Sequence, residues 1–423
     1  MRGPQRVNPD EFIDLILKHA PISRSDLARE AGVSRAAVTH FVQDLVAFGV
    51  VEDNIPTLSA GGRKATGIRL DLSRYFMIAL RINRYELTFG VFDGSGELIE
   101  SRETPIDPDI RIEALLDLAE STIRELRDGR DSELFLGIAI STLGWLFESD
   151  GGITLHTDGF DELGKRDIRA ELQARFSDVP VLLEHDAKTS ALAEYHDHLA
   201  ETGRKPVCLL NVVGGIGLGG GIVIDGKIFR GARGVAGEVG HLGINFNSAI
   251  HTRNSETTEF NGLLEDYASP RALRQHLTSR LLDFPESTLT EHSSIDDIDR
   301  AFSEGDPLAV WVIDRVGKLL AYGLAGLVFV LDPDVIVLGD AFPASAVIRD
   351  QVREHLAAYL PATLVDRIEL KQSRRGTSGV LYGSYLLLMQ WYVSNRKLYE
   401  RIERTSPADT PQRVLELGDP EAS

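Results

Sequence analysis

The sequence predicts an N-terminal winged helix-turn-helix domain followed by a two-lobed α/β body. Two short helical patterns meet at Gly32, and two short β-type runs flank a basic loop after them. Further along, two β-meanders recur, each ahead of helix–strand units, which indicates an internal duplication of one α/β module. At 423 residues the chain is long enough for two or three domains with a large core.

Residues 22–49 carry the features of a helix-turn-helix. Ser23 opens the first helix with Asp26 three residues on, as in a capping box, and Ser34 caps the second helix. Small residues around Gly32 allow the close approach that a tight turn requires. An ordinary helical hairpin is the alternative, but caps, small residues and apolar spacing agree on a helix-turn-helix. The apolar residues at helical spacing in the second helix are Val38, Val42 and Leu45.

The opposite face of the second helix carries polar side chains that can reach base edges or phosphates in a DNA major groove. The following β-type runs, at 50–51 and 68–70, predict a wing whose basic tip suits a phosphate or minor-groove contact. A solvated turn would give the same tip. The candidate DNA-binding residues are Ser34, Arg35, Ala37, Thr39, His40, Gln43, Arg63 and Lys64.

Composition separates the N-terminal domain from the body. The formal net charge is −19, which argues against a protein that coats nucleic acid without specificity. Residues 1–70 nevertheless carry nine Lys/Arg against eight Asp/Glu, so the acidic excess lies in the body. The single cysteine, Cys208, sits in an apolar run and is expected in a buried strand of a protein from a reducing cytoplasm. No signal peptide or membrane-spanning stretch is expected.

The positions of the helix-turn-helix, the wing and the two meanders indicate the domain boundaries. A winged helix-turn-helix is expected over 1–70, a first α/β lobe over 71–200 and a second over 201–376. A helix at 377–395 should complete the first lobe, and 396–423 should be a polar tail.

Each lobe is expected to begin with a meander. In the second meander the run GGIGLGGG is interpreted as a turn between strands at 207–213 and 222–224. The first meander has strands at 75–80, 87–92 and 98–99. The later helices are expected at 111–127, 167–176, 187–200, 307–330, 345–359 and 377–394, and the later strands at 134–141, 181–184, 335–338 and 367–370.

Two lobes built by duplication usually enclose a cleft that binds a ligand near the strand C-termini. Carboxylates and an imidazole in such a cleft suit a polyhydroxylated ligand, because each carboxylate can accept from two vicinal hydroxyls. Taken singly, each residue has a plainer explanation as a helix cap, a loop pair or a solvated helix residue. The candidates are Asp186, Glu238, His241 and Glu265.

These motifs and their order resemble the ROK family of repressors and sugar kinases, in its N-acetylglucosamine and xylose repressor-like branch, over residues 6–395. The stretches that carry the resemblance are the GGR wing, EHDAKTSALAE, GIVIDGKIFRGARGVAGEVGHLG, GLLEDYAS and DPDVIVLG. The resemblance implies an actin-like fold of duplicated RNase-H-like lobes, with Asp186 at the position of the kinases' catalytic base. It implies the sugar ligands His185, Asp186, Glu238, His241 and Glu265.

The departures from the family pattern bear on activity. Where ROK kinases carry a D-x-G-G-T turn for the ATP phosphates, this chain has RINRY at 81–85, with two cations in place of the carboxylate and glycines. The second turn is Gly215-Ile216-Gly217, without the kinases' threonine, although its glycines could still form an anion-binding nest. Phosphoryl transfer depends on positioning and charge stabilisation, so we expect no catalytic residue, no kinase activity and no cofactor.

Two further departures concern metal and sugar. Many family members carry a C-x-C-G-x-x-G-C run after the GExGH histidine, but no cysteine lies between His241 and Glu265 here, so no zinc or other metal is expected. His185 and Lys188 stand where the family usually has asparagine, which should alter the sugar that fits.

The sequence thus favours a sugar-responsive transcriptional regulator in the cytoplasm, and we expect this regulator to be a repressor. Its expected partners are operator DNA and a sugar or sugar-derivative effector, with no membrane partner, and it is expected to form a homodimer or homotetramer. Two alternatives remain: an active ROK-type sugar kinase with an appended DNA-binding domain, and a DNA-bound scaffold that answers to a protein partner.

Overall fold

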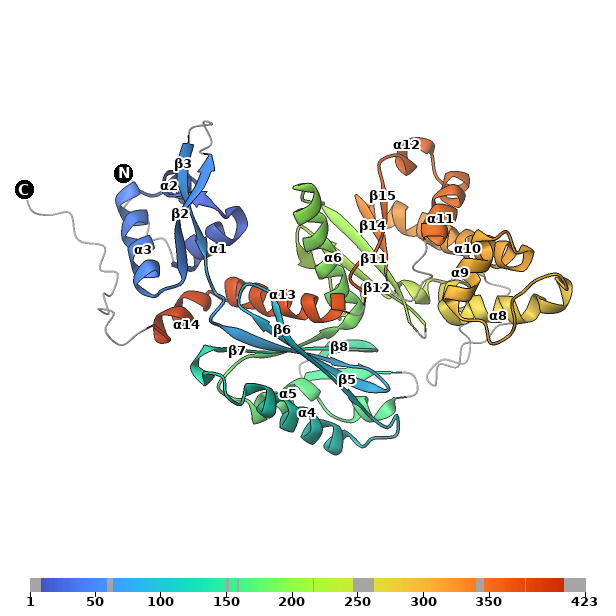
Figure 1. Cartoon of the computed structure of the whole chain (residues 1–423), viewed down its shortest axis with the longest axis horizontal. Helices are drawn as coiled ribbons and strands as arrows, with labels where there is room; N and C mark the ends of the chain where they lie inside the picture. Colours follow the sequence, from blue (N-terminus) through green and yellow to red (C-terminus); the bar gives the residue numbers. More distant parts are fainter. Residues whose placement is uncertain are drawn as a thin grey trace, which may run out of the picture.

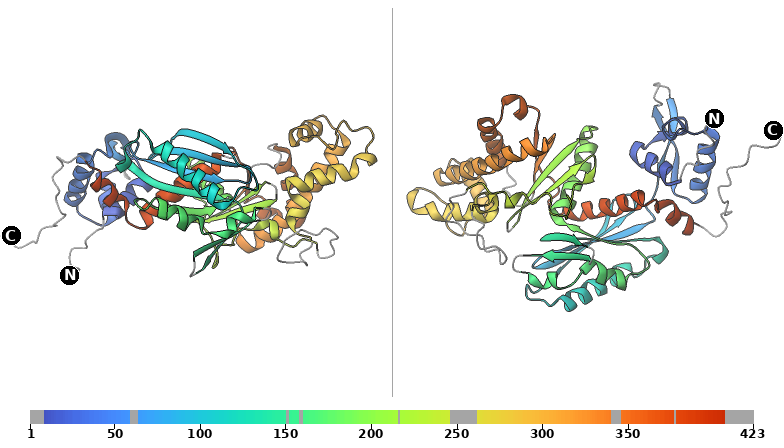
Figure 2. Two further views of the ribbon diagram at one scale, coloured as in Figure 1. Left: turned by 90° about the horizontal axis from the view of Figure 1, so that it is seen from below. Right: turned by 180° about the vertical axis from the view of Figure 1, so that it is seen from behind.

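The computed structural model describes residues 9–58, 64–149, 152–157, 160–215, 217–245, 262–339, 346–376 and 378–406. These residues form an N-terminal helical unit and two lobes that are each built on a five-stranded sheet (Figure 1). The N-terminal unit and the helical face of the second lobe lie at opposite ends of the molecule (Figure 2). None of the helices in the described ranges is long and apolar enough to cross a membrane.

The N-terminal unit, residues 9–70, is called the head below. Ser23 Oγ accepts the N–H of Asp26 at 3.1 Å and Ser34 Oγ accepts that of Ala37 at 3.2 Å, so both predicted helix caps are confirmed. Gly32 ends the first helix of the pair with a φ of 68°, a conformation that favours glycine. The head comprises α1 (Pro9–His19), β1 (Ile22–Ser23), α2 (Arg24–Ala31), α3 (Arg35–Ala47), β2 (Val51–Leu58) and β3 (Lys64–Leu70), with an antiparallel sheet of order β1-β3-β2.

The first lobe has the strand order β10-β7-β4-β5-β6. Its antiparallel meander is extended beside β4 by two parallel strands, α4 and α5 cover one face, and α13 packs on β4 and β7 from the other (Figure 1). The elements are β4 (Phe76–Ile82), β5 (Glu86–Asp93), β6 (Leu98–Pro105), α4 (Ile112–Arg127), β7 (Phe135–Thr142), α5 (Ile168–Arg175), β10 (Val181–His185) and α13 (Ser378–Ser394), with a hairpin of β8 (Trp145–Ser149) and β9 (Gly152–His156).

The second lobe repeats this topology in the order β13-β12-β11-β14-β15. The repetition of a meander followed by two parallel strands confirms the predicted duplication of one α/β module. Helix α6 (Asp186–Thr202) covers one face of this sheet and packs on α13. The strands are β11 (Cys208–Gly214), β12 (Leu218–Ile224), β13 (Lys227–Ile228), β14 (Val335–Leu338) and β15 (Glu369–Gln372). The remaining helices are α7 (Leu264–Ala268), α8 (Pro270–Arg280), α9 (Ile295–Ser303), α10 (Pro307–Leu331), α11 (Ala346–Tyr359) and α12 (Ala362–Val365).

Strand β12 differs from the sequence prediction, which placed a turn over all of 214–221. The strand begins at Leu218, so three glycines lie within it. At Gly221 an added Cβ would lie 2.5 Å from the carbonyl oxygen of Ala187, and at Gly220 it would lie 2.6 Å from that of Gly237. The glycines therefore serve close backbone packing against α6 and the 237–241 turn.

The C-terminal end also differs from the prediction. Residues 398–404, expected within a polar tail, form helix α14 (Leu398–Arg404), in which Leu398 and Ile402 are buried. Helix α14 packs on α1, and one apolar core runs through the head, β4, α13 and α14. Because the core is shared, the head is packed onto the body through side chains as well as joined to it by the chain.

Candidate functional site

The start of β12, with Gly217 just before it, forms the meeting point of the predicted sugar-binding segments. At Gly217 an added Cβ would lie 2.5 Å from Glu265 Oε2, and at Gly219 it would lie 3.8 Å from His185 Cε1. At Gly240, within the turn that carries Glu238 and His241, it would lie 3.2 Å from the same Glu265 oxygen. Missing side chains at three glycines thus allow His185, Glu265 and the turn to approach one strand end.

Asp186 lies at the start of α6 and pairs with a cation from β4, two strands away in the same sheet. Arg81, near the end of β4, donates to Asp186 Oδ2 at 3.3 Å, and the two side chains are 16% and 21% exposed. The parallel register explains the meeting: Arg81 lies beside Ser141 of β7, which lies beside Glu184 of β10, two residues before Asp186. His185 Nε2 is 3.8 Å from the other oxygen of Asp186.

Polar atoms at three of the predicted sugar ligands are buried without a hydrogen-bond partner among the described residues. They are Glu238 Oε1, His241 Nδ1 and His185 Nδ1. Buried polar atoms in folded proteins nearly always have a partner, and an unpaired one costs about 1–3 kcal/mol. Three such atoms on segments that meet at β12 are therefore suited to a ligand rich in hydroxyl groups.

The two lobes touch through the loop that precedes this turn. Arg230 Nε donates to Glu184 Oε2 at 2.7 Å, and the fully buried ammonium of Lys188 donates to the carbonyl oxygen of Gly234. The ring of Trp145, from the β8–β9 hairpin, meets the ring of His241 edge-on with centroids 4.5 Å apart. Lys188 thus has a backbone partner at Gly234, and His241, a predicted sugar ligand, lies against the first lobe.

Trp145 and Arg81 were not among the predicted site residues. An aromatic residue directly after a buried strand was the available signal for Trp145. Arg81 was noted only as a replacement for a kinase carboxylate, and its partner lies 105 residues away in the sequence.

The turn that would face nucleotide phosphates is only partly described. The N–H of Gly215 donates to the carbonyl oxygen of Gly217 at 3.0 Å, while residue 216 lies outside the described residues. No group of three or more His, Cys, Asp or Glu side chains that could hold a metal ion is found within the described ranges.

In the head, helix α3 presents most of the candidate DNA-binding residues to solvent, while its apolar face is buried. Two of them have local partners: Ser34 Oγ caps the helix, and Thr39 Oγ1 donates to the carbonyl oxygen of Arg35 at 2.8 Å. Ala37 is half-buried, which leaves three long polar side chains on the exposed face. These are Arg35, His40 and Gln43. Arg63 lies outside the described residues, as does the side chain of Lys64, whose backbone begins β3.

Residues 77–390 match the family model described as "ROK family". The chain is 27% identical to the xylose repressor of Caldicellulosiruptor bescii over 345 residues, 79% of this chain and 83% of that protein. It is also 27% identical to the DNA-binding transcriptional repressor Mlc of Escherichia coli over 396 residues, 90% of this chain and 93% of Mlc.

Among solved structures, the chain is similar to a ROK family transcriptional regulator described as a homologue of E. coli Mlc. The TM-score is 0.77 at 23% identity, over 94% of this chain and 98% of the other. At that identity the likeness concerns the fold, which is the actin-like arrangement of two lobes.

Proposed function

Because the chain belongs to the ROK family, we propose that it is a transcriptional repressor whose affinity for operator DNA changes when a sugar or sugar derivative binds between the lobes. The observation that carries the proposal is the set of buried polar atoms on His185, Glu238 and His241 that have no partner among the described residues and gather around β12 close to Asp186 and Glu265. The Mlc and xylose repressors to which the chain is similar favour the repressor role.

The proposed sugar site combines acceptors and donors. Asp186, Glu238 and Glu265 would accept from vicinal hydroxyls, and the histidines can donate or accept according to tautomer. Trp145 would add an apolar ring beside His241. A bound sugar would touch groups from both lobes, so it would favour one relative position of the lobes over others.

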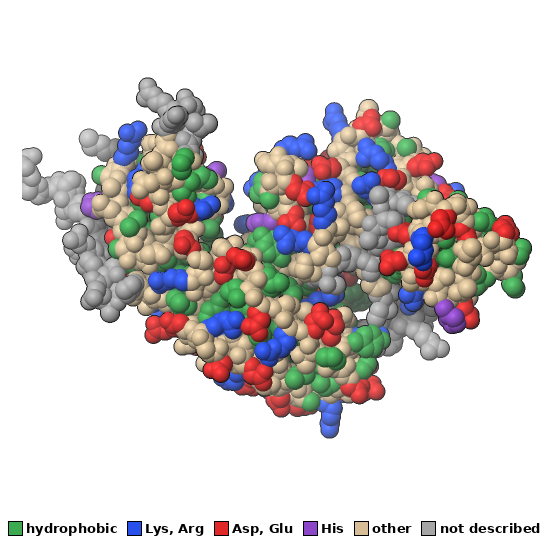
Figure 3. Space-filling view, in the orientation of Figure 1, with side chains coloured by type: hydrophobic (Ala, Val, Ile, Leu, Met, Phe, Trp, Pro, Cys, Tyr) green, Lys and Arg blue, Asp and Glu red, His purple; other side chains and the backbone are tan. Residues whose placement is uncertain are grey.

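The proposed reader of DNA is the head, as a winged helix-turn-helix with α3 in the major groove. Arg35, His40 and Gln43 would contact base edges or phosphates, and the 59–64 tip would contact the DNA backbone. A homodimer would place two heads on a palindromic operator whose half-sites are about 34 Å apart. The protein would act in a reducing cytoplasm. In the space-filling view the head and the second lobe stand as separate masses above the first lobe (Figure 3).

Helices α6, α13 and α14 connect the proposed sugar site to the head. Helix α13 packs on β4, β7 and α6, and α14 continues from it to the head. A change in the position of α6, whose first residue is Asp186, would thus bear on α13 and then on the head.

An active sugar kinase is the alternative, supported by the retained Asp186 and the glycine turn. Against it stands the Arg81–Asp186 ion pair, which places a guanidinium beside the carboxylate that would have to accept a hydroxyl proton. Two arginines also occupy the first turn, where the family's kinases have a carboxylate and glycines.

The test separates the two sites. DNA fragments selected by the chain itself from genomic DNA serve as the operator, and binding is measured with and without each member of a panel of sugars. Arg35→Ala and Gln43→Ala should weaken DNA binding and leave sugar affinity unchanged, whereas Glu238→Gln should do the reverse. Arg274→Ala, at an exposed cation of α8, is the control and should change neither.

Two results would contradict the proposal. One is the absence of any sugar effect on DNA binding across the panel. The other is ATP-dependent phosphorylation of a sugar that disappears in Asp186→Asn, which would establish the kinase instead.

A further inference from the structure

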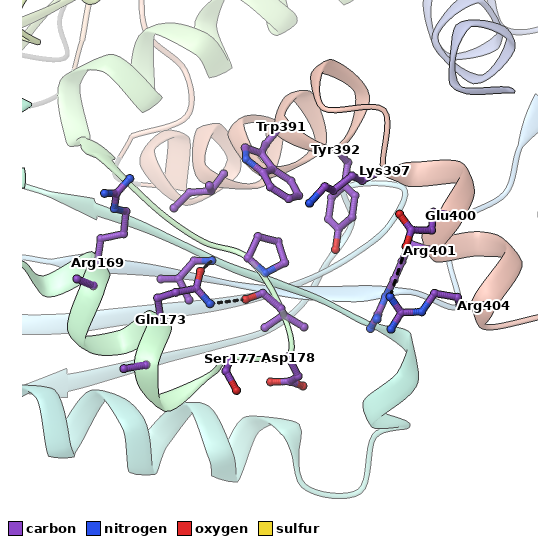
Figure 4. A pocket seen from close by; sticks show the side chains of 16 residues that line it. Arg169, Gln173, Ser177, Asp178, Trp391, Tyr392, Lys397, Glu400, Arg401 and Arg404 are labelled. Carbon is purple, nitrogen blue, oxygen red and sulfur yellow. Dashed lines mark hydrogen bonds and ion pairs between the residues drawn. The ribbon is translucent and has the colours of Figure 1, made fainter. Parts of the chain in front are cut away.

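A cavity of about 810 Å³ lies away from the inter-lobe site, between the first lobe and the C-terminal helices. One wall is α5 with the loop that leads into β10, and the other is the end of α13 and helix α14 (Figure 4). This volume is in the range of small-molecule sites, about 300–1,000 Å³. The site proposed for the sugar uses none of the residues that line it.

The cavity offers an apolar surface with an aromatic ring. Pro180, Val181 and Leu182 line it from the first lobe, and the half-buried ring of Trp391 faces it from α13 (Figure 4). The ammonium of Lys397 lies 5.3 Å from the centroid of that ring. A planar ring can stack on such a surface with a cation beside it.

The charges around the cavity are unbalanced towards the positive. Its two carboxylates are already paired: Asp178 lies 3.2 Å from Arg127, outside the cavity, and Glu400 lies 3.8 Å from Arg404. The other lining cations are Arg169, Lys397 and Arg401.

Arg401 supports an anion in particular. It donates through one nitrogen to the backbone carbonyl oxygens of Glu133 and Phe135, at 2.7 and 2.6 Å, so its charge faces no carboxylate there. Its Nε is buried and has no hydrogen-bond partner among the described residues. Three of the lining cations, Arg169, Lys397 and Arg401, thus have no ion-pair partner among the described residues, which favours an anionic ligand.

We propose that this cavity binds a small phosphate monoester that carries a planar ring, such as a nucleoside monophosphate. Arg169 and Arg401, which lie on opposite sides of Trp391 (Figure 4), each offer a guanidinium group of the shape that binds a phosphate, and Trp391 takes the ring. This second site goes beyond the sugar-responsive function and does not depend on it.

Occupancy of the cavity bears on the head. Helix α14 forms one wall, and the same helix holds the head, since the N–H groups of Leu398 and Tyr399 donate to Asp10 of α1 at 3.1 Å. A ligand that contacts both walls fixes α14 against the first lobe. It therefore restricts where the head can lie, which couples the cavity to DNA binding.

The test is calorimetric titration of the full chain with AMP. Ribose 5-phosphate, which carries the phosphate without the base, and adenosine, which carries the base without the phosphate, are titrated separately. We expect saturable binding of AMP and weaker binding of each of the other two. Arg169→Glu and Lys397→Glu should each weaken AMP binding by about tenfold or more, because a charge-assisted contact becomes repulsive. The matched reversal Arg274→Glu, on the exposed face of α8, should leave it unchanged.

Thermal unfolding shows whether each variant is folded. In a Trp145→Phe, Trp311→Phe background, Trp391 is the remaining tryptophan and its fluorescence should respond to AMP. The proposal is overturned if AMP does not bind, if folded Arg169→Glu and Lys397→Glu bind it as the parent does, or if Arg81→Glu abolishes binding while Arg169→Glu does not. The last result would assign AMP to the inter-lobe turn.

Discussion

Tyr399 is an α14 side chain that packs against α3, and its removal should loosen the head alone. Its ring lies 5.9 Å from that of Phe41 in α3, nearly parallel, and 6.0 Å from that of Phe48, edge-on. Each aromatic pair is worth about 0.5–1.5 kcal/mol beyond the burial of area. With the lost burial of a half-exposed ring added, Tyr399→Ala should weaken the attachment of the head by roughly 2–4 kcal/mol.

Hydrogen exchange of the backbone amides measures this directly. A loss of that size corresponds to roughly 30- to 700-fold faster exchange in α3 and α1, whereas α10 in the second lobe should exchange as before. Tyr399→Phe is the matched control: burial raises the pKa of the Tyr399 hydroxyl, which stays neutral, and both ring contacts are kept. Exchange in α3 that is unchanged in Tyr399→Ala, or equally accelerated in α10, would refute the reasoning.

Three further predictions concern packing and burial. Burial raises the pKa of Asp10 above its ordinary value, so the free energy of unfolding should fall as pH rises through the raised pKa and the buried carboxyl ionises. We therefore expect Asp10→Asn to match or exceed the parent in chemical denaturation at pH 7. Asp10→Ala leaves two N–H groups of α14 without this acceptor and should cost about 1–3 kcal/mol. Gly221→Ala should cost about 1–3 kcal/mol of unfolding free energy, whereas Gly215→Ala, with nothing within 4 Å of an added Cβ, should be nearly neutral; equal effects would contradict the packing argument. Burial raises the pKa of Cys208 to about 11, so iodoacetamide at pH 8 should label the native chain far more slowly than the unfolded chain, as mass spectrometry would show.

The head illustrates what local sequence signals can predict. The caps at Ser23 and Ser34 and the left-handed Gly32 are set by neighbours within a few residues, so the sequence contains them directly. The two meanders were predictable for the same reason, because alternation and turn residues are local. Helix α14 was missed because it is short and mostly charged, and Leu398 is buried in a core that joins the head, nearly 390 residues away in the chain, to α13.

The candidate site was less accessible to sequence reasoning. Motif order indicated its residues, but the Arg81–Asp186 ion pair depends on the register of three strands that are distant in the chain. The glycines of β12 were interpreted as a turn because a glycine run has no side-chain pattern. Pairing with β11 keeps them in a strand, and the nearby backbone of Ala187 and Gly237, which the sequence does not place, leaves no room for side chains.

The shared core has a consequence for how a signal could reach DNA. A head on a free linker would keep its operator affinity whatever the lobes do, because its orientation would be independent of theirs. Here Phe12 and Phe41 of the head belong to the same buried core as Leu388 of α13 and Leu398 of α14. Reorienting the head without breaking that core requires α13 and α14 to move with it. A ligand that shifts these helices slightly therefore has to displace α3 or loosen its attachment, and in the proposed homodimer either change would alter the fit of the two heads to fixed half-sites.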